Sequence, residues 1–493
     1  MTTRRIGLGC WTFALVFGLV VGIGYVSVPR ANAIPAFSRK YGTSCATCHS
    51  DFPELNEFGE AFKKNGFKFP KDDDMFVKEP PVMLGAKAQK DAFPGAIFPG
   101  EIPGSLPIAF RYSGNFNWNA KQPQPVQATS FLPQTDLFVP NTFTIISAGS
   151  FGQNLSFWID DDISAGGTGA GGGLGDGYLR YNDLGHRFGL PKDALNVRFG
   201  QFELDLPFSQ ARTIYPSGYD AFSEAAVAPP ATVPGTILTT SNPFVLGTPQ
   251  RGIEFGGYPN DGNFNWSVAV VDGTNSAYGL GPGLTARNTK DIYIRVSQKF
   301  NLERDSESRS GIQAAGPTGP RDHTSLRVGA FYYHGWNQLN FGGSQYGLLG
   351  TSTGTFTEPF YRAGGDLRFK YRKMELFGVG LVGHDENHTV DTVAQTITGA
   401  RAVNFTGGFA GGNFWVYPWM IAYMRYDFVN SPADLANGVS QYQTRNRFSP
   451  GFQVLVRANI KVIGEYQYHW GVSNGAAGFY RPNSFVSGID YVF

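Results

Sequence analysis

The chain has 493 residues, of which 42% are hydrophobic and 15% aromatic, and its formal net charge at pH 7 is +1. This balance excludes the strongly basic surface expected of a nucleic-acid-binding protein. Beyond the N-terminal segment no run of about 18 apolar residues occurs, so no membrane-spanning helix is expected. The 64 glycines and 42 phenylalanines, with few charges, instead indicate a transmembrane β-barrel, which carries aromatic residues at both membrane interfaces.

Residues 1–33 form a predicted signal peptide. Two arginines are followed by an apolar stretch over residues 11–28 and by a small-residue cleavage site at residues 31–33. The mature chain would begin at or close to Ile34 and would no longer contain Cys10. A single uncleaved anchor is the alternative interpretation of the same stretch.

Five consecutive residues, Cys45-Ala46-Thr47-Cys48-His49, match the covalent attachment site of a c-type haem. In such a site two thiols on one turn bond to the macrocycle, and the adjacent imidazole is an axial ligand of the iron. A redox-active dithiol would explain the two cysteines but not His49. A structural zinc site would need four ligands, and no second cysteine pair or nearby histidine supplies them. We therefore predict one covalent haem c on Cys45 and Cys48, with His49 as its axial ligand.

The stretch Asp51-Phe52-Pro53-Glu54 has the features of a helix start, with an Asp cap, Pro in the first turn and Glu three residues after the cap. Gly66 supplies a stop. Between them apolar residues recur at three- and four-residue spacing: Phe52, Leu55, Phe58 and Phe62. This pattern predicts a helix whose aromatic stripe walls the haem, within a small α-helical monohaem cytochrome domain and linker over residues 34–104.

The second axial ligand of the haem iron has two candidates in this domain, Met83 and Met75, its only methionines. A thioether ligand would raise the reduction potential, which suits a weakly reducing donor such as Fe(II). The alternative interpretations are that both methionines only fill the core, or that the position is open. A barrel residue is a further alternative, for which His334, His384 and His469 are candidates.

From residue 105 to residue 493 the hydrophobic pattern changes to period two, which is typical of strands with one face in lipid and one in a lumen. A soluble β-sandwich has similar alternation. Aromatic residues at strand ends and the terminal strand from Phe485 to Phe493 favour an outer-membrane barrel, because that ending resembles the C-terminal signature of such proteins. At about ten residues per strand we predict an all-β antiparallel barrel of about 16 strands, with 14 or 18 as alternatives.

Three patterns give specific expectations within this region. Residues 253–270 predict a hairpin, with its turn at residues 260–262. Residues 415–423 form an aromatic ladder with a bulge at Pro418, and residues 452–462 alternate as one strand. Four arginines are expected to face the lumen: Arg111, Arg198, Arg295 and Arg457.

The N-terminal part resembles a known family. Residues 34–42, the haem motif, and the residues Phe52-Pro53-Glu54-Leu55-Asn56, Phe58-Gly59 and Phe62-Lys63 are similar to the outer-membrane fused monohaem cytochrome–porins. The order of signal peptide, haem domain and barrel is also the same. The resemblance implies thioether bonds at Cys45 and Cys48 and proximal ligation by His49. It implies electron transfer in the bacterial outer membrane, with Fe(II) oxidation as one activity of the family.

These observations leave three hypotheses. In the first, a haem domain plugs or abuts the lumen and carries electrons from an extracellular donor such as Fe(II) to a periplasmic cytochrome. In the second, the chain is a solute porin whose haem domain is a plug, redox sensor or gate, and the arginines select anions. In the third, electrons flow outward.

Fe(II) could be held by carboxylates at residues 72–74 or 160–162, for which solvated turns are the alternative. Porins of this size often form trimers, so a homotrimer in outer-membrane lipid is a further expectation.

Overall fold

The structure, a computed structural model, describes most of the chain after residue 35. The predicted signal peptide, including Cys10, lies outside the described residues. Among the residues that are described, no helix has the length and apolar character needed to cross a membrane. The described ranges are 36–70, 72–85, 87–95, 100–104, 106–120, 134–163, 174–223, 237–239, 242, 244–259, 262–273, 289–302, 324–341, 354–391, 396–430, 445–470 and 482–493.

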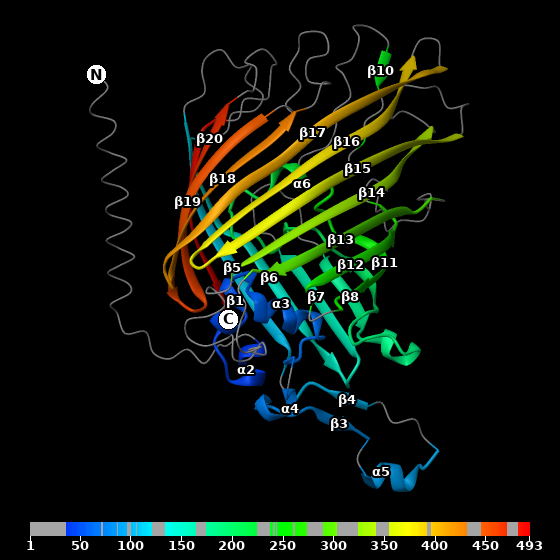
Figure 1. The fold of residues 1–493 in the computed structure, drawn as a ribbon, viewed down its shortest axis with the longest axis vertical. Coiled ribbons are helices and arrows are strands. Elements are labelled where there is room, and N and C mark those ends of the chain that lie inside the picture. Colours follow the sequence, from blue (N-terminus) through cyan, green and yellow to red (C-terminus); the bar gives the residue numbers. More distant parts are fainter. Residues whose placement is uncertain are drawn as a thin grey trace.

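Sixteen antiparallel strands form a closed barrel (Figure 1), because β21 pairs with β5 and β9 pairs with β11. This confirms the prediction of an all-β antiparallel barrel of about 16 strands. A short strand, β10 (Ile237–Thr239), pairs with the end of β16 and is additional to the ring. The sixteen strands are β5 (Ile108–Asn119), β6 (Thr135–Phe151), β7 (Leu155–Ile163), β8 (Leu174–Tyr181), β9 (Asn196–Phe202), β11 (Gln250–Gly257), β12 (Phe264–Val271), β13 (Asp291–Asn301), β14 (Ser325–Phe341), β15 (Gly354–Tyr371), β16 (Met374–Asp391), β17 (Thr396–Tyr417), β18 (Met420–Asn430), β19 (Arg445–Arg457), β20 (Ile460–Trp470) and β21 (Ser484–Val492).

The C-terminal residue closes the ring. The Phe110 backbone N–H donates to the Phe493 carbonyl at 2.7 Å, and the Phe493 N–H donates back to the Phe110 carbonyl at 2.8 Å. Their rings stack with centroids 5.4 Å apart. The terminal strand predicted from its alternating pattern is therefore the one that joins the two ends of the sheet.

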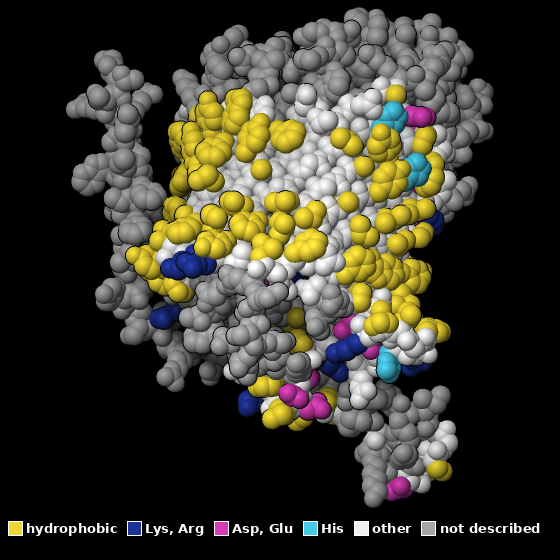
Figure 2. Space-filling view, in the orientation of Figure 1, with side chains coloured by type: hydrophobic (Ala, Val, Ile, Leu, Met, Phe, Trp, Pro, Cys, Tyr) yellow, Lys and Arg dark blue, Asp and Glu magenta, His cyan; other side chains and the backbone are white. Residues whose placement is uncertain are grey.

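The period-two alternation separates an outer face from a lumen face on each strand. On β13, Ile292, Ile294 and Val296 are exposed outward, whereas Tyr293 and Arg295 are buried inside the barrel. Figure 2 shows hydrophobic side chains spread in a broad band over the visible outer face. Exposed aromatic residues mark the strand ends, as predicted, including the stacked pair Tyr417 and Trp419. Such an apolar belt with aromatic margins fits a lipid bilayer.

Two of the patterns cross a turn that the sequence did not reveal. Residues 415–423 form the end of β17 and the start of β18, joined by a two-residue turn at Pro418, with a register shift just before it. Residues 452–462 likewise form β19 and β20, rather than one strand. Arg457 stands at this turn and is exposed, so the prediction that it faces the lumen is wrong. By contrast, the hairpin of β11 and β12 is confirmed, although Asn260 and Asp261 of its turn lie outside the described residues.

Residues 203–223 and 244–249, between β9 and β11, fold into the barrel interior; we call them the inserted segment. Arg212 pairs with Asp176 of β8 at 2.9 Å, and the Tyr215 hydroxyl donates to Asn413 of β17 at 2.6 Å. Its short helix α6 (Asp220–Ser223) lies within the ring in Figure 1. Its aromatic side chains join those of the wall in one buried cluster, so the segment crosses the lumen.

The N-terminal segment, residues 36–104, consists of short elements. In Figure 1 its residues 49–64 overlap the lower end of the barrel strands, whereas residues 73–102 lie below them. The segment lies at the end where the short hairpin turns and the C-terminus are found. The predicted helix start at residues 51–54 is wrong: these residues form a tight turn between two short strands, and the helix begins at Glu57 with Asn56 as its cap. Gly66, with a φ of +70°, follows the helix end as predicted. The elements are α2 (Ala36–Tyr41), η1 (Cys45–Thr47), β1 (His49–Asp51), β2 (Glu54–Leu55), α3 (Glu57–Lys64), α4 (Asp73–Phe76), β3 (Val82–Leu84), α5 (Lys87–Ala92) and β4 (Gly100–Ile102).

Candidate functional site

The two cysteines of the motif lie on a single turn. Ser44 caps the 3₁₀ helix η1, and the Cys48 N–H donates to the Cys45 carbonyl at 3.1 Å. Both cysteines are half-buried free thiols. The spacing therefore brings Cys45, Cys48 and His49 together locally, as the sequence predicted.

Asn56 holds this turn in place, and sequence reasoning gave it no role in the site. Its side-chain amide donates to the carbonyls of Ala46 at 3.3 Å and Thr47 at 3.0 Å. Its side-chain oxygen accepts from the Gly59 N–H at 2.9 Å, which caps α3. Asn56 is 2% exposed, so these bonds are shielded from water. One buried amide thus joins the cysteine turn to the helix that follows it.

Gly59 allows α3 to lie directly against the motif. The Cys48 carbonyl accepts from the Asn56 N–H at 2.9 Å, and a Cβ added at Gly59 would overlap that same carbonyl oxygen. The sequence signal for this contact is the glycine within the first turn of an otherwise amphipathic helix.

The electrostatic environment favours neutral groups at the motif. Burial raises the pKa of the Cys48 thiol to about 12, and burial also raises the pKa of Cys45. A reactive dithiol needs a lowered thiol pKa, so this environment does not favour the dithiol alternative. Burial lowers the pKa of His49 to about 4, against an opposing effect of backbone contacts at Glu54 and Pro53. The imidazole is therefore neutral at pH 7, which is the form that ligates metals.

His49 also has an unused ring nitrogen. Its Nδ1 atom is buried and has no hydrogen-bond partner among the described residues. Such an orphaned buried nitrogen is costly unless a ligand or another group satisfies it. The zinc alternative gains no support, because the described residues contain no group of three or more His, Cys, Asp and Glu suited to a metal ion.

The aromatic stripe forms a cluster of its own, which we call the N-terminal aromatic cluster. Its buried members are Tyr41, Phe58, Phe62, Phe67 and Phe69, with Ala148 of the barrel. Tyr41 and Phe69 stack at 4.2 Å, and the ring of Trp158 on β7 lies 5.7 Å from that of Phe67. Cys48 packs at the edge of this cluster.

Only part of the predicted stripe enters this cluster. Phe58 and Phe62 do, whereas Phe52 is buried elsewhere and Leu55 is half-buried. The side chains of this cluster pack against one another. They close one side of the motif to water.

The barrel wall holds the N-terminal segment through three charged contacts. Lys461 of β20 donates to the Phe52 carbonyl, Arg368 of β15 pairs with Glu54, and Lys299 of β13 pairs with Glu57 at 2.7 Å. These strands surround the lumen entrance, so the segment abuts the lumen rather than lying apart from the barrel. The contacts join residues more than 200 positions apart, and no local sequence pattern marks them.

The candidate distal ligands are not gathered at the motif. Met75 lies on α4 with 77% of its surface exposed, and Met83 lies in β3, where its side chain is outside the described set. His334 and His384 lie in the outward-facing rows of β14 and β16, where they stack with Tyr332 and Tyr361, respectively. His469 lies eight residues along β20 from Lys461, about 26 Å away at the usual strand rise.

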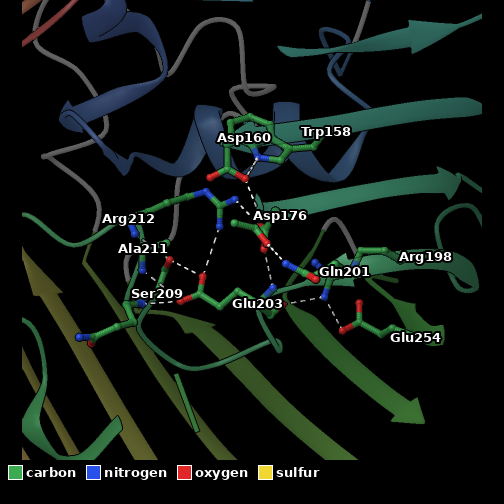
Figure 3. A network of polar contacts seen from close by, with 12 residues as sticks. Trp158, Asp160, Asp176, Arg198, Gln201, Glu203, Ser209, Ala211, Arg212 and Glu254 are labelled. Atoms are coloured by element: carbon green, nitrogen blue, oxygen red, sulfur yellow. Dashed lines mark hydrogen bonds and ion pairs between the residues drawn. The ribbon is translucent and has the colours of Figure 1, made fainter. Parts of the chain in front are cut away.

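The carboxylates at residues 160–162 lie within β7 rather than in a turn after it. Asp160 accepts from Trp158 Nε1 at 3.1 Å and from the Asp176 N–H at 2.5 Å. Figure 3 shows this carboxylate in a network with Asp176, Arg212 and Glu203. Asp160 is therefore engaged in a structural network, which does not favour a role as an open ligand for Fe(II).

Three of the predicted lumen arginines are engaged in ion pairs. Arg198 pairs with Glu254 at 2.6 Å and Arg295 with Asp366 at 2.8 Å. Arg111 pairs with Asp490 at 2.8 Å. Paired guanidinium groups still give the lumen wall a polar surface, but their charge is locally balanced.

No protein-family model matches the sequence, and no curated protein is similar to it. Among solved structures, OmpF of Salmonella typhi in complex with daunomycin has a TM-score of 0.48 and 10% identity, covering 78% of this chain and 97% of that one. The outer-membrane channel DcaP of Acinetobacter baumannii has a TM-score of 0.45 and 13% identity, covering 78% and 96%. An anion-selective porin from Comamonas acidovorans has a TM-score of 0.45 and 13% identity, covering 78% and 98%. At these identities the similarity concerns the fold alone.

Proposed function

We propose that this chain is a bacterial outer-membrane barrel that transfers electrons through one haem c bound at its periplasmic end. The single observation that carries the proposal is the set of free thiols at Cys45 and Cys48 beside a neutral His49 with an orphaned ring nitrogen. The short turns gather at the end of the barrel where this set lies, and in outer-membrane barrels short turns are periplasmic.

The donor set fits a covalent haem, with Cys45 and Cys48 as attachment points and His49 as the axial ligand. When bound, haem c supplies reversible one-electron chemistry of its iron. The chain's own residues position the motif: Asn56 fixes the cysteine turn, and the N-terminal aromatic cluster excludes water from one side. Met83 and Met75 stay candidates for the distal position.

The contacts between the N-terminal segment and the barrel wall support a role in electron transfer, because they hold the motif at a fixed position, which a loosely tethered domain would not have. The contacts of Lys461, Arg368 and Lys299 fix the motif relative to the lumen. Electron transfer depends steeply on the distance between donor and acceptor, so a fixed position is an advantage. The proposed partners are an extracellular donor such as Fe(II) and a periplasmic cytochrome, within outer-membrane lipid and with a homotrimer as the expected assembly.

Anaerobic stopped-flow spectroscopy tests the proposal. The oxidised holoprotein in detergent is mixed with Fe(II), and rapid appearance of reduced haem bands is expected. The protein is then placed in vesicles that contain an oxidised cytochrome, which should be reduced only when Fe(II) is added outside. Absence of covalent haem in protein matured in a haem c-competent host would overturn the proposal. Reduction by a stronger reductant but not by Fe(II) would remove Fe(II) as the donor and favour outward electron flow.

A solute porin with a redox-sensitive plug is the second candidate. It is favoured by the polar lumen wall, in which charged residues such as Arg425 and Asp427 face the interior. Similar rows of charge occur in pores that select ions. Planar-bilayer conductance separates the two candidates, because a porin passes ionic current and the proposed conduit passes little.

A further inference from the structure

A polar cavity of about 310 Å³ lies between the N-terminal segment and the barrel wall. One side is formed by residues 54–64, including α3, and the other by β8, β9 and the strands from β11 to β15, with the start of the inserted segment. None of the predicted haem ligands lines it. Its size is within the range of small-molecule sites.

The cavity contains positive groups without an ion-pair partner. Ten lining residues are Lys or Arg and six are Asp or Glu. Most acids are committed to one particular cation, as in Glu254 with Arg198 and Glu57 with Lys299. Within the described part of the chain, five lining cations make no ion pair within 4.0 Å: Lys63, Lys64, Arg180, Arg327 and Lys370.

Arg180 is the clearest of these groups. It is only 8% exposed, and its Nη2 atom is buried without a hydrogen-bond partner among the described residues. Its Nη1 atom reaches only the Lys63 carbonyl, at 3.5 Å. A buried guanidinium nitrogen without an acceptor is costly, so a ligand that accepts from it would be stabilising.

Lys64 and Arg180 lie against the same aromatic ring. The Lys64 ammonium lies 4.8 Å from the Tyr258 ring centroid, and the Arg180 guanidinium lies 5.1 Å from the same centroid. Arg327 adds a third cation from β14, where its Nη1 donates weakly to Ser297 at 3.4 Å. All three cations line the same cavity, Lys64 from the N-terminal segment and Arg180 and Arg327 from the barrel.

The pKa values of Lys63 and Lys64 agree with a surplus of positive charge in the cavity. Burial and the neighbouring Arg212 lower the pKa of Lys63 to about 8. Burial, followed by repulsion from Arg327, lowers the pKa of Lys64 to about 8, although Glu60 opposes this. Both ammonium groups thus lack enough negative charge nearby to hold their usual pKa.

We infer that this cavity binds a small oxyanion with two or more negative charges, held by Arg180 and Arg327 from the barrel and by Lys63 and Lys64 from α3. Tetrahedral inorganic anions and small polycarboxylates share this chemistry. A bound anion bridges the two walls, so it fastens the N-terminal segment to the barrel. The inference does not depend on the proposed electron transfer.

Isothermal titration calorimetry of the full-length protein, purified with its cofactor in detergent at pH 7 and low salt, tests the inference. Sulfate and citrate are titrated separately, and one-to-one binding of at least one is expected. Arg180→Gln and Arg327→Gln should each weaken binding by about tenfold or more, as expected for loss of a charge-assisted hydrogen bond. The matched control is Lys192→Gln, which removes an exposed charge outside the cavity.

Each calorimetry result either supports or overturns the proposed anion site. Binding of sulfate assigns a tetrahedral inorganic ligand, and binding of citrate alone assigns a polycarboxylate; both support the site. No binding of either anion, or equal affinity in Arg180→Gln, Arg327→Gln and Lys192→Gln, overturns it. Heat-modifiable migration on a denaturing gel shows whether each variant has a folded barrel, and two variants from different strands guard against misfolding of one. Neither result alters the test of covalent haem.

Discussion

The Lys461 ammonium donates a hydrogen bond to the backbone carbonyl of Phe52 and lies 4.7 Å from the centroid of the Phe52 ring. Lys461 is 1% exposed, and its other partners are Gln453 at 3.0 Å and Asp490 at 3.8 Å. Lys461, a wall residue of β20, thereby binds the turn that directly follows the predicted haem ligands. The contact couples the position of the motif to the barrel itself.

Replacing Lys461 by methionine should loosen the N-terminal segment while the barrel stays folded. The Phe52 carbonyl would lose its buried donor, which costs about 1–3 kcal/mol. The detached population should rise by about 5- to 150-fold, since 1.4 kcal/mol is a factor of ten. The rate of protease cleavage within residues 36–104 of the folded protein measures this change. Lys192→Met is the control, and an unchanged cleavage rate in Lys461→Met would contradict the anchoring role.

Covalent haem should depend on two cysteines and not on the third. The double variant Cys45→Ala/Cys48→Ala removes both thiols, so haem should no longer migrate with the polypeptide on a denaturing gel. Cys10→Ala is the matched control, because Cys10 lies in the predicted signal peptide, and it should retain full haem staining. Haem that stays attached in the double variant would exclude the predicted site.

The two hydrogen bonds that Asn56 donates to the cysteine turn should affect haem attachment more than the hydrogen bond by which it caps α3. Asn56→Asp keeps an oxygen for the Gly59 N–H but loses the donors to Ala46 and Thr47, whereas Asn56→Leu loses all three bonds. Because Asp and Asn cap helices about equally well, any effect shared by both variants comes from the cysteine turn. We expect both to lower covalent haem yield and to shift the midpoint potential. Normal behaviour of Asn56→Asp would show that Asn56 acts only as a helix cap.

Arg425 should keep the inserted segment across the lumen. Its side chain is fully buried, pairs with Asp427 at 2.7 Å and donates to Ser217 at 2.9 Å and to the Gly218 carbonyl. Arg425→Met breaks this buried set, at a cost of about 3–5 kcal/mol. In planar bilayers the variant should conduct more ions than the wild-type protein. Lys373→Met, at an exposed turn, should not; equal conductance of both variants would argue against a closing role for the segment.

The affinity of the cavity for sulfate should fall as the pH rises through about 8. Lys63 and Lys64 have pKa values lowered to about 8, so both are charged below this pH and lose their protons above it. An anion binds the charged forms, so affinity is full below pH 8 and should be at least about tenfold lower at pH 9.5. The charged groups that act on these lysines are Glu60, Asp176, Arg198, Asp205, Arg212 and Arg327, and Lys63 also acts on Lys64.

Calorimetry at pH 7 and pH 9.5 measures this dependence, because sulfate keeps its charge between these values. The double variant Lys63→Gln/Lys64→Gln should bind weakly and nearly independently of pH. A pH-independent affinity in the wild-type protein would mean that these lysines do not hold the anion.

Much of the barrel follows from the sequence alone. Successive side chains on a strand point to opposite faces, so the alternation of β13 separates Ile292 and Ile294 from Tyr293 and Arg295 without knowledge of their neighbours. The same alternation explains where prediction failed. The two-residue turn by itself would shift the alternation by one residue, because Arg457 and Ile460 pair across it, but the register shift between Leu455 and Arg457 restores it. Residues 452–462 therefore alternate across the hairpin of β19 and β20 as they would along one strand.

The Cys-x-x-Cys-His motif and its one-turn spacing are also local, and the sequence determined them without any tertiary information. Only the tertiary structure decided that Asn56 rather than Asp51 caps the helix, since both carry a suitable side chain and the cap depends on which one meets the Gly59 N–H. It likewise decided that Lys461 holds Phe52 and that Arg180 and Lys64 meet at the Tyr258 ring. Such contacts join residues brought together by closure of the barrel, and local periodicity carries no information about partners hundreds of positions away.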